Sequence, residues 1–463
     1  MKFSFRLLAA VLGVCTVLSL FSCASSPVLQ TEESQTQTET GGKTEAAPEL
    51  PPLTGQATIT GNAVCDETVT CSVKNLSART GELCYRWYLD GEVLPGATDK
   101  KLVIPVTAAG KSLSAEVFTE ETSGTVKSEA IVPEKSTKSE MSFAGLWYDV
   151  KKIGRVSLSG SSVAVDWTPS GVELHVQSTG GNFTVHYSCG TAAYFAVNVD
   201  GQKLDRFYCL AGKSSFSFPL GAGEHTVTLL KDSSPGTSKT ALDSVEFAGT
   251  LLEKPADKAF YIEFIGDSIA CGSGSLGRYK AGEAWKSADH SGTNSFCYFL
   301  SSSLDADYSV VAKGGIGLLK ESDGHTMPEI YEKTAGLRDS TALYDFARVP
   351  DLVILELGAN DSAKTYSEEE YFSALSKMVK TIREKYGEKV PIVWVGKSEA
   401  HFASATRLAG LASQKGKLFA FQYTYGGSGS AALATQSSGH PNSAEQKAFA
   451  DAIEAFLREN KII

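Results

Sequence analysis

The stretch FYIEFIGDS, residues 260–268, decides the fold of the C-terminal half of this chain. Its first six side chains are bulky and mostly apolar, which is typical of a strand buried on both faces of a parallel sheet. Gly266 then permits a tight turn, so Ser268 stands at the carboxyl end of the strand. The functional sites of such sheets lie at that edge. Ser268 is therefore a candidate nucleophile, although a serine in a turn more often caps a helix.

Strand and helix patterns alternate from this stretch to the end of the chain. Apolar runs of strand length are followed by longer stretches with the apolar spacing of helices. This alternation predicts an α/β/α domain with a parallel sheet over residues 258–463. The further strands are expected at 308–312, 352–357, 390–395 and 418–422, and the helices at 294–304, 368–386, 404–414 and 443–458.

Groups that a nucleophilic serine needs follow two of these strands and precede the last helix. Gly315 comes after the second strand, where a glycine leaves a backbone N–H free to face the cleft. Asn360 comes after the third strand and offers its side-chain amide as an oxyanion donor. His440 precedes the last helix, and an imidazole accepts a serine proton near neutral pH. The other histidines of this domain, His290, His325 and His401, are expected to be solvated loop residues.

Together these four blocks resemble, in order, those of the SGNH (GDSL-type) hydrolases. The resemblance implies that Ser268 is the nucleophile and that His440 acts first as general base and then as acid. It also implies an oxyanion hole made of the Ser268 N–H, the Gly315 N–H and the side chain of Asn360. Such a hole needs no cofactor, and the sequence has no Cys or His cluster at ligand spacing, so we expect no metal.

Ser437 departs from the pattern of these hydrolases. They usually carry Asp three residues before the catalytic histidine, and Ser437 occupies that position. Losing the orienting carboxylate can cost about 10⁴ in rate where nothing replaces it. A backbone carbonyl can also accept the imidazole Nδ1–H and fix the ring. We therefore expect a Ser268–His440 dyad.

Residues 142–250 alternate polar and apolar side chains at the period of a β-strand, which predicts two packed antiparallel sheets. A β-sandwich directly before a Gly-Asp-Ser strand resembles carbohydrate esterase family 2, whose members join a jelly-roll to an SGNH domain and deacetylate xylan and related glycans. The resemblance covers about residues 143–463 and implies a carboxylic ester hydrolase acting on acetylated polysaccharide or oligosaccharide. The stretches that agree are 199–201, 223–227, 263–272 and 350–354.

Two other functions remain as alternatives. The first is a surface glycan-binding protein with a weakened esterase domain, which the replacement of the acid by Ser437 favours. The second is a general short-chain lipase or thioesterase, which would differ from a deacetylase in its preference for acyl-chain length. Intact Ser268, Gly315, Asn360 and His440 argue against a decayed site.

Residues 53–134 contain short alternating runs between turn signals. The stretch YRWY, residues 85–88, followed by the hairpin turn Asp90-Gly91, resembles a bacterial Ig-like module with Trp87 as its core residue. Ala115 occupies the position where antibody domains carry their second cysteine, so that cysteine pair is incomplete here. We expect this domain to be a spacer or an adhesion module.

The N-terminus resembles a secretory signal, because Lys2 and Arg6 precede an apolar run at 7–21. That run is shorter than the ~20 apolar residues of a spanning helix. The residues Leu-Phe-Ser-Cys that end at Cys23 resemble the bacterial lipobox, which implies removal of residues 1–22 and a lipid on Cys23. An uncleaved anchor and a plain signal are the alternatives. Residues 23–52 are polar and predict a disordered tether, so we expect an exported lipoprotein at the bacterial cell surface or in the periplasm.

The net charge of −10, without a basic cluster, argues against nucleic acid as a partner. It also leaves the lipid on Cys23 as the only expected contact with a membrane. Of nine cysteines, seven remain after Cys15 and Cys23 are set aside, so at least one thiol is expected to be free. We expect the protein to be a monomer.

Overall fold

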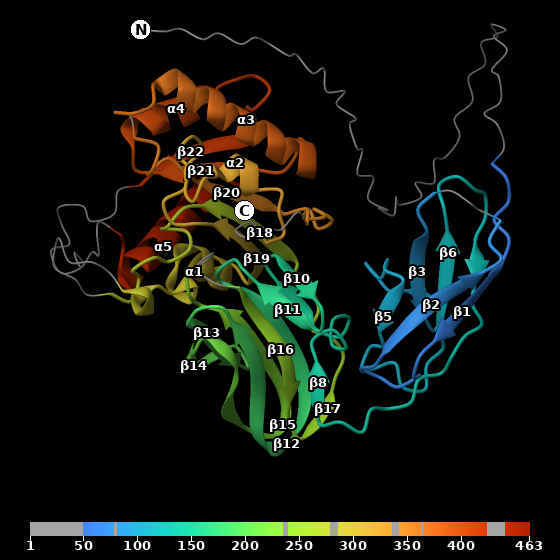
Figure 1. The fold of residues 1–463 in the computed structure, drawn as a ribbon. Helices are drawn as coiled ribbons and strands as arrows, with labels where there is room; N and C mark the ends of the chain where they lie inside the picture. The colour runs from blue at the N-terminus through green and yellow to red at the C-terminus, as the bar shows by residue number, and fades with distance from the viewer. Residues whose placement is uncertain are drawn as a thin grey trace, which may run out of the picture. The chain divides into compact units, whose positions relative to one another are not determined.

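The structure is a computed structural model that describes residues 50–77, 81–234, 239–277, 286–335, 342–362, 364–423 and 440–463 (Figure 1). The predicted signal, Cys23, most of the predicted tether and Ser437 lie outside the described residues. The chain divides into two compact units. One contains most of the N-terminal β-region, up to residue 131, and the other contains residues 132–463.

The N-terminal β-region consists of a three-stranded and a four-stranded sheet, in the orders β1-β2-β5 and β4-β3-β6-β7. Trp87 is fully buried and pairs with Ala115 on the neighbouring strand, which confirms Trp87 as a core residue. Asp90 and Gly91 take positive φ angles of 50° and 85°, as their predicted hairpin turn requires. The strands are β1 (Gln56–Thr60), β2 (Thr68–Lys74), β3 (Cys84–Leu89), β4 (Glu92–Val93), β5 (Lys101–Val103), β6 (Leu113–Phe118) and β7 (Val126–Lys127).

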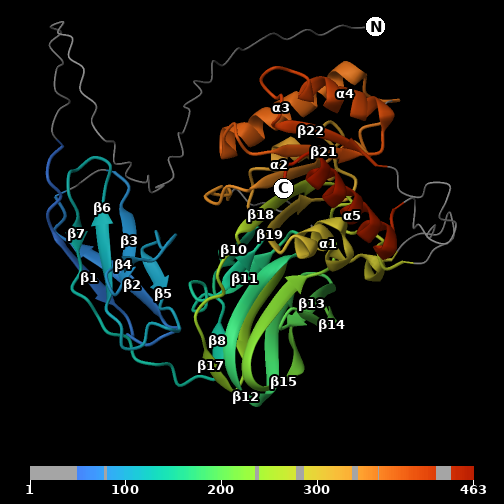
Figure 2. The ribbon, with the colours of Figure 1, turned by 180° about the vertical axis from the view of Figure 1, so that it is seen from behind.

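The central β-region is one hydrogen-bonded sheet of ten strands, although we expected two separate sheets. Its strands β12 and β15 are 20 residues long and pair along most of their length. β12 passes through Gly180 and Gly181, which have positive φ, and changes its second neighbour from β9 and β17 to β16. These long strands make the sheet continuous (Figure 2). The strands are β8 (Glu140–Ser142), β9 (Lys151–Ile153), β10 (Val156–Ser159), β11 (Ser162–Val165), β12 (Ser170–Cys189), β13 (Ala193–Val199), β14 (Gln202–Cys209), β15 (Gly212–Lys231), β16 (Thr240–Glu246) and β17 (Gly249–Leu251).

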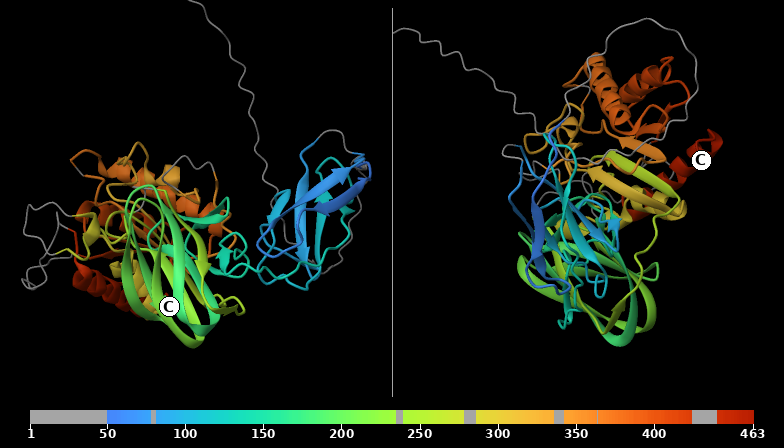
Figure 3. Two further views of the ribbon diagram at one scale, coloured as in Figure 1. Left: turned by 60° about the horizontal axis from the view of Figure 1, so that its bottom comes forward. Right: turned by 90° about the vertical axis from the view of Figure 1, so that its right-hand side faces the viewer.

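The C-terminal region has the predicted parallel sheet, with five strands in the order β19-β18-β20-β21-β22. Helices α1 and α5 contribute to one hydrophobic core and α3 and α4 to another, one on each face of the sheet (Figure 3). The helix predicted at 368–386 is confirmed. The one predicted at 404–414 instead begins at Glu399, because Ser398 caps it. The elements are β18 (Phe260–Gly266), α1 (Phe296–Ser303), β19 (Ala306–Ala312), α2 (Met327–Ile330), β20 (Leu352–Glu356), α3 (Glu368–Tyr386), β21 (Ile392–Gly396), α4 (Glu399–Ala409), β22 (Leu418–Gln422) and α5 (Ser443–Glu459).

A buried ion pair joins the central β-region to the parallel sheet. Arg155, just before β10, places its guanidinium 2.8 Å from the carboxylate of Glu263 in the middle of β18, and both side chains are fully buried. The hydroxyls of Tyr331 and Tyr386 donate to the same carboxylate at 2.7 and 3.1 Å. Because each charge is paired and hydrogen-bonded, the contact fixes β18 against the central β-region.

The described part of the chain contains buried free thiols, as the odd cysteine count predicted. One of them, Cys271, follows Ser268 by three residues, and burial raises the pKa of its thiol to about 12. Cys271 is therefore a thiol and not a thiolate near neutral pH, as a packing residue should be. Across the described ranges, no helix is long and apolar enough to cross a membrane.

Candidate active site

The structure brings together Ser268 and His440, which are 172 residues apart in the chain. Ser268 lies in the turn after β18, and His440 lies just before α5. The distance from Ser268 Oγ to His440 Nε2 is 2.7 Å, which is a hydrogen bond of the length that proton transfer requires. Both side chains are half-buried, so the pair remains open to a substrate.

Helix α5 holds His440 beside the nucleophile turn through three hydrogen bonds. Gln446 donates to the Ile269 carbonyl at 3.0 Å, directly after Ser268 in the chain. The backbone N–H of Ser443 donates to the Ser275 carbonyl at 2.7 Å, and its hydroxyl to Asn294 at 2.9 Å. The start of α5 is thus tied to the turn that carries Ser268, and this fixes the separation of base and nucleophile.

Gly315 lies in the segment after β19 that passes close to Ser268. A Cβ placed on the preceding Gly314 would be 3.9 Å from the Ser268 Cβ, so the end of β19 runs beside that serine. Gly315 itself has a φ of +76°, a conformation that glycine adopts without strain. Within the described residues, neither the Ser268 N–H nor the Gly315 N–H donates a hydrogen bond. Both donors are available to an oxyanion.

Asn360 reaches the same place, but its amide already has two acceptors. Its Nδ2 donates to Asp267 Oδ2 at 3.0 Å and to the Ile316 carbonyl at 2.8 Å. These contacts hold the amide next to Gly315 and fix its orientation. To donate to an oxyanion, Asn360 must share or give up one of these hydrogen bonds. Asp267 is thus the residue that orients Asn360, a role that the sequence did not reveal.

Behind the site, two carboxyl groups are buried together. Burial raises the pKa of Asp267 to about 6, and burial followed by the charge of Asp267 raises the pKa of Glu356 well above its ordinary value. The Asp267 N–H contacts Glu356 Oε2 at 3.4 Å. The pair therefore retains a proton near neutral pH. The only sign of this in the sequence is that Glu356 is a carboxylate in an otherwise apolar strand.

The remaining polar residues of the domain have structural roles. Asp361 accepts backbone hydrogen bonds from residues 318–320 at 2.8–2.9 Å, which fixes the loop after Gly315. His325 is exposed, as expected, but the expected solvation of His290 and His401 is wrong, because both are buried. His401 stacks on Tyr371 with 3.9 Å between ring centroids.

His290 is fully buried, and Arg206 of β14 donates a hydrogen bond to its backbone carbonyl. Burial, followed by the positive charge of Arg206, lowers the pKa of His290 to about 3, so its ring is neutral at the pH at which His440 works. In the described part of the chain, no group of three His, Cys, Asp or Glu side chains could hold a metal ion.

Comparison with known proteins agrees with this geometry. Residues 264–463 match the GDSL-like lipase/acylhydrolase family. The chain is 28% identical to the cellulase/esterase CelE of Acetivibrio thermocellus, over 48% of this chain and 27% of that protein. It is 25% identical to the acetylxylan esterase/glucomannan deacetylase of Cellvibrio japonicus, over 51% of this chain and 65% of that protein. The chain thus spans less than two thirds of the length of either relative.

Among solved structures, the fold is similar to that of a family two carbohydrate esterase from Clostridium thermocellum in complex with cellohexaose. The TM-score is 0.59 and the identity 22%, over 67% of this chain and 98% of that one. The likeness extends beyond residues 264–463 and therefore includes part of the β-regions. Residues 264–463 form a GDSL-like lipase/acylhydrolase domain, as the order of Ser268, Gly315, Asn360 and His440 predicted.

Proposed function

We propose that this protein is a serine esterase that removes O-acetyl groups from an acetylated polysaccharide or oligosaccharide. The observation that carries the proposal is the 2.7 Å contact between Ser268 Oγ and His440 Nε2, beside the unused N–H groups of Ser268 and Gly315. The names of the two curated relatives, a cellulase/esterase and an acetylxylan esterase/glucomannan deacetylase, support this class of substrate.

The geometry supports a two-step reaction through an acyl-enzyme. Ser268 Oγ attacks the acetyl carbonyl carbon while His440 Nε2 accepts the hydroxyl proton. The carbonyl oxygen becomes an oxyanion that accepts hydrogen bonds from the Ser268 and Gly315 N–H groups. The bond to the sugar oxygen then breaks, and that oxygen takes the proton from His440. A water molecule that gives its proton to His440 hydrolyses the acetyl ester, and Ser268 regains its proton as acetate leaves.

We propose that the reaction uses the Ser268–His440 dyad, with a backbone carbonyl in the role of the missing acid. Ser437, which replaces the acid in the sequence, lies outside the described residues. A carbonyl fixes the imidazole tautomer but adds no charge to support the imidazolium. The expected consequence is a slower enzyme with the same chemistry.

The proposal extends to the rest of the chain, with domains at 1–22, 23–52, 53–134, 142–250 and 258–463. The long curved strands of the central β-region support a jelly-roll, and the buried Trp87 with its hairpin supports an Ig-like spacer or adhesion module. The sequence around Cys23 supports a lipid anchor that holds an exported monomer at the cell surface or in the periplasm.

Release of acetate from acetylated xylan tests the proposal. Wild type should release acetate, and Ser268→Ala should release it at the rate of the reaction without enzyme. Ser273→Ala is the matched control, because Ser273 lies in the same turn and its hydroxyl contacts only the Cys271 thiol, at 3.7 Å, among the described residues. Equal release by wild type and Ser268→Ala, with Ser273→Ala unchanged, would overturn the assignment of Ser268.

A glycan-binding protein with a weakened esterase domain is the second candidate. The engagement of both Asn360 donors by Asp267 and Ile316 favours it, since that donor is not free for an oxyanion. In that case wild type would retain acetylated xylan in a pull-down assay but release acetate no faster than Ser268→Ala. A general lipase or thioesterase would instead prefer long acyl chains in a series of nitrophenyl esters, whereas the proposed deacetylase prefers acetate.

A further inference from the structure

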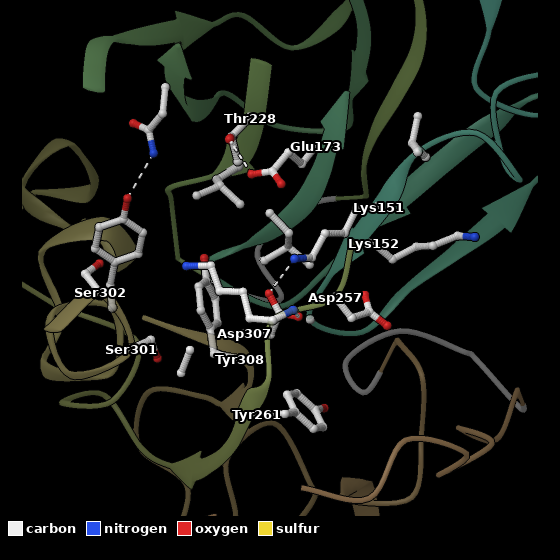
Figure 4. A pocket seen from close by; sticks show the side chains of 18 of the residues that line it. Lys151, Lys152, Glu173, Thr228, Asp257, Tyr261, Ser301, Ser302, Asp307 and Tyr308 are labelled. Carbon is white, nitrogen blue, oxygen red and sulfur yellow. Dashed lines mark hydrogen bonds and ion pairs between the residues drawn. The ribbon is translucent and has the colours of Figure 1, made fainter. Parts of the chain in front are cut away.

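A cavity lies at the opposite edge of the parallel sheet from Ser268. It has a volume of about 470 Å³, within the ~300–1,000 Å³ typical of small-molecule sites. Tyr261 and Asp307, at the amino ends of β18 and β19, contribute to its lining (Figure 4). Ser268 follows Tyr261 by seven positions, which corresponds to about 23 Å of extended strand. This cavity is therefore distinct from the catalytic site.

The floor of the cavity is a fixed set of ion pairs between the central β-region and the sheet. Lys151 of β9 is 5% exposed, and its ammonium lies 2.7 Å from Asp307 Oδ1 and 2.9 Å from the Ala256 carbonyl. Arg348 contacts the other oxygen of Asp307 at 2.7 Å. Figure 4 shows Lys151 and Asp307 pointing toward each other across the cavity floor. Charged groups fixed in this way form a preorganised surface for a polar ligand.

The walls offer both donors and acceptors. Glu173 of β12 accepts a hydrogen bond from the Thr228 hydroxyl at 3.0 Å on one carboxylate oxygen only. Helix α1 contributes Ser302, which is exposed, from the other side. Among the described residues, the buried hydroxyl of Tyr308 has no hydrogen-bond partner. These side chains can form further hydrogen bonds, and the cavity is large enough for a ligand. Together they point to a ligand with several hydroxyl groups.

The charges of the lining are unbalanced. Two of its cations, Lys152 and Lys254, form no ion pair among the described residues, although the charges of Asp149 and Asp257 act on Lys152. The Lys152 side chain extends away from Asp307 in Figure 4, and its ammonium lies 4.3 Å from the ring centroid of Trp147. Burial, followed by repulsion from Lys254, lowers the pKa of Lys152 to about 8. The lining contains five cations, Lys151, Lys152, Lys254, Lys258 and Arg348, and three carboxylates, Glu173, Asp257 and Asp307, while Asp305 outside the lining pairs with Lys258 at 2.8 Å.

We propose that this cavity binds an acidic sugar, a pyranose unit that carries a carboxylate. The exposed ammonium group of Lys254 attracts the carboxylate, Lys152 adds positive charge nearby, and the polar walls hydrogen-bond the sugar hydroxyls. Because this lining carries more cations than carboxylates although the chain has a net charge of −10, it favours an anion as the ligand. The site binds the sugar without catalysing a reaction, and the inference does not depend on the activity of Ser268.

Binding to the full chain, measured by calorimetry, tests the proposal with three probes. They are a disaccharide of glucuronic acid and xylose without acetyl groups, the neutral disaccharide xylobiose, and inorganic phosphate. The uronate should bind at least about tenfold more tightly than xylobiose, the contribution of one charge-assisted contact. Phosphate binding as tight as that of the uronate would overturn the sugar assignment and leave an anion site.

Two variants locate the binding. Ser302→Trp fills the cavity from an exposed position on α1 and should abolish uronate binding. Ser303→Trp is its matched control, since Ser303 is also exposed on α1 but does not line the cavity, and it should bind as wild type does. If Ser302→Trp perturbs folding in a thermal melt, Lys254→Glu at the exposed rim should still weaken uronate binding by about tenfold or more. Unchanged uronate binding in a folded Ser302→Trp or in Lys254→Glu would overturn the proposal.

Discussion

At the carboxyl edge of the parallel sheet, the donors beside Ser268 are backbone N–H groups and the amide of Asn360, and behind them lie the carboxyls of Asp267 and Glu356, whose pKa values are raised by burial. At the amino edge the groups are charged, and Lys151 and Asp307 form an ion pair on the floor of the cavity. The difference fits the two proposed tasks. A reaction that creates an oxyanion favours neutral, oriented donors, because their benefit appears only in the transition state. A ligand with a permanent charge is held by permanent charges.

The largest effect that separates the two edges is expected from His440→Ala. Without the base, the Ser268 hydroxyl keeps its proton, and kcat for acetate release should fall by about 10⁴ to 10⁶. Uronate binding at the amino edge should not change. His325→Ala is the matched control, because His325 is an exposed histidine of the same domain, and it should leave both readouts unchanged. A loss of uronate binding in His440→Ala would show that the edges are coupled.

The two edges also differ in how far the sequence could predict them. The apolar run before Gly266 predicted β18, and the order of Ser268, Gly315, Asn360 and His440 predicted a site, because one strand end after another supplies one group each. The residues that line the amino-edge cavity come from separate segments of the central β-region and of the C-terminal α/β region. No local sequence pattern predicts that these residues lie together. A sequence motif can predict a site only when the groups of that site follow recognisable elements of the fold.

Burial was the second property that the sequence could not provide. His290 was expected in solvent, yet it is fully buried, and Arg206 of β14, 84 residues earlier, contacts its backbone carbonyl. The central sheet was expected as two sheets, yet β12 continues through Gly180 and Gly181. In each case the outcome depends on a tertiary contact or on the path of a long strand. Glu356 is an exception, because a carboxylate inside an apolar strand already signals a buried group with an unusual pKa.

The buried pair of Arg155 and Glu263 should affect both edges together, because it holds β18 against the central β-region. Arg155→Met leaves the Glu263 charge buried without its partner, which should lower the free energy of unfolding by about 3–5 kcal/mol. Denaturant titration measures this loss. The matched control is Arg407→Met, which breaks the exposed ion pair with Glu369 and should cost at most about 1 kcal/mol. Equal costs for the two variants would contradict the structural role of the buried pair.

Asn360→Ala tests whether the Asn360 amide takes part in the reaction at the carboxyl edge. If its amide serves the oxyanion, kcat should fall by about 10²–10³ while KM changes little, since the contact forms only in the transition state. If the amide stays with Asp267 and Ile316, the variant should lose stability but keep its kcat. Acetate-release kinetics with a thermal melt separate these outcomes. Asn460→Ala, at the exposed end of α5, is the control and should retain wild-type kinetics.

Asp267 should make the protein less stable as the pH rises. Burial raises its pKa from an ordinary 3.8 to about 6, so its protonated form is favoured in the folded state. Its contribution to stability is therefore present below about pH 4 and is lost as the pH rises through 6, by up to about 3 kcal/mol. The free energy of unfolding of Asp267→Asn should accordingly fall less between pH 4 and 6 than that of wild type. Identical slopes for variant and wild type would refute the raised pKa.

Asp307, at the amino edge, should have the opposite effect: it should make the protein less stable as the pH falls, by a smaller amount. Burial alone would raise its pKa, but hydrogen bonds from Lys151 and Arg348 outweigh burial and lower it. The contribution of Asp307 is therefore present above its ordinary pKa and is lost as the pH falls through the lower folded value. Asp307→Asn should cost about 1 kcal/mol at pH 7, and the deficit should shrink in acid. Asp305→Asn, two residues away and 89% exposed, should show a smaller change, because solvent screens its ion pair with Lys258. A deficit for Asp307→Asn that grows in acid would mean that the ion pairs do not control this carboxylate, and the contrast between the two edges would fail.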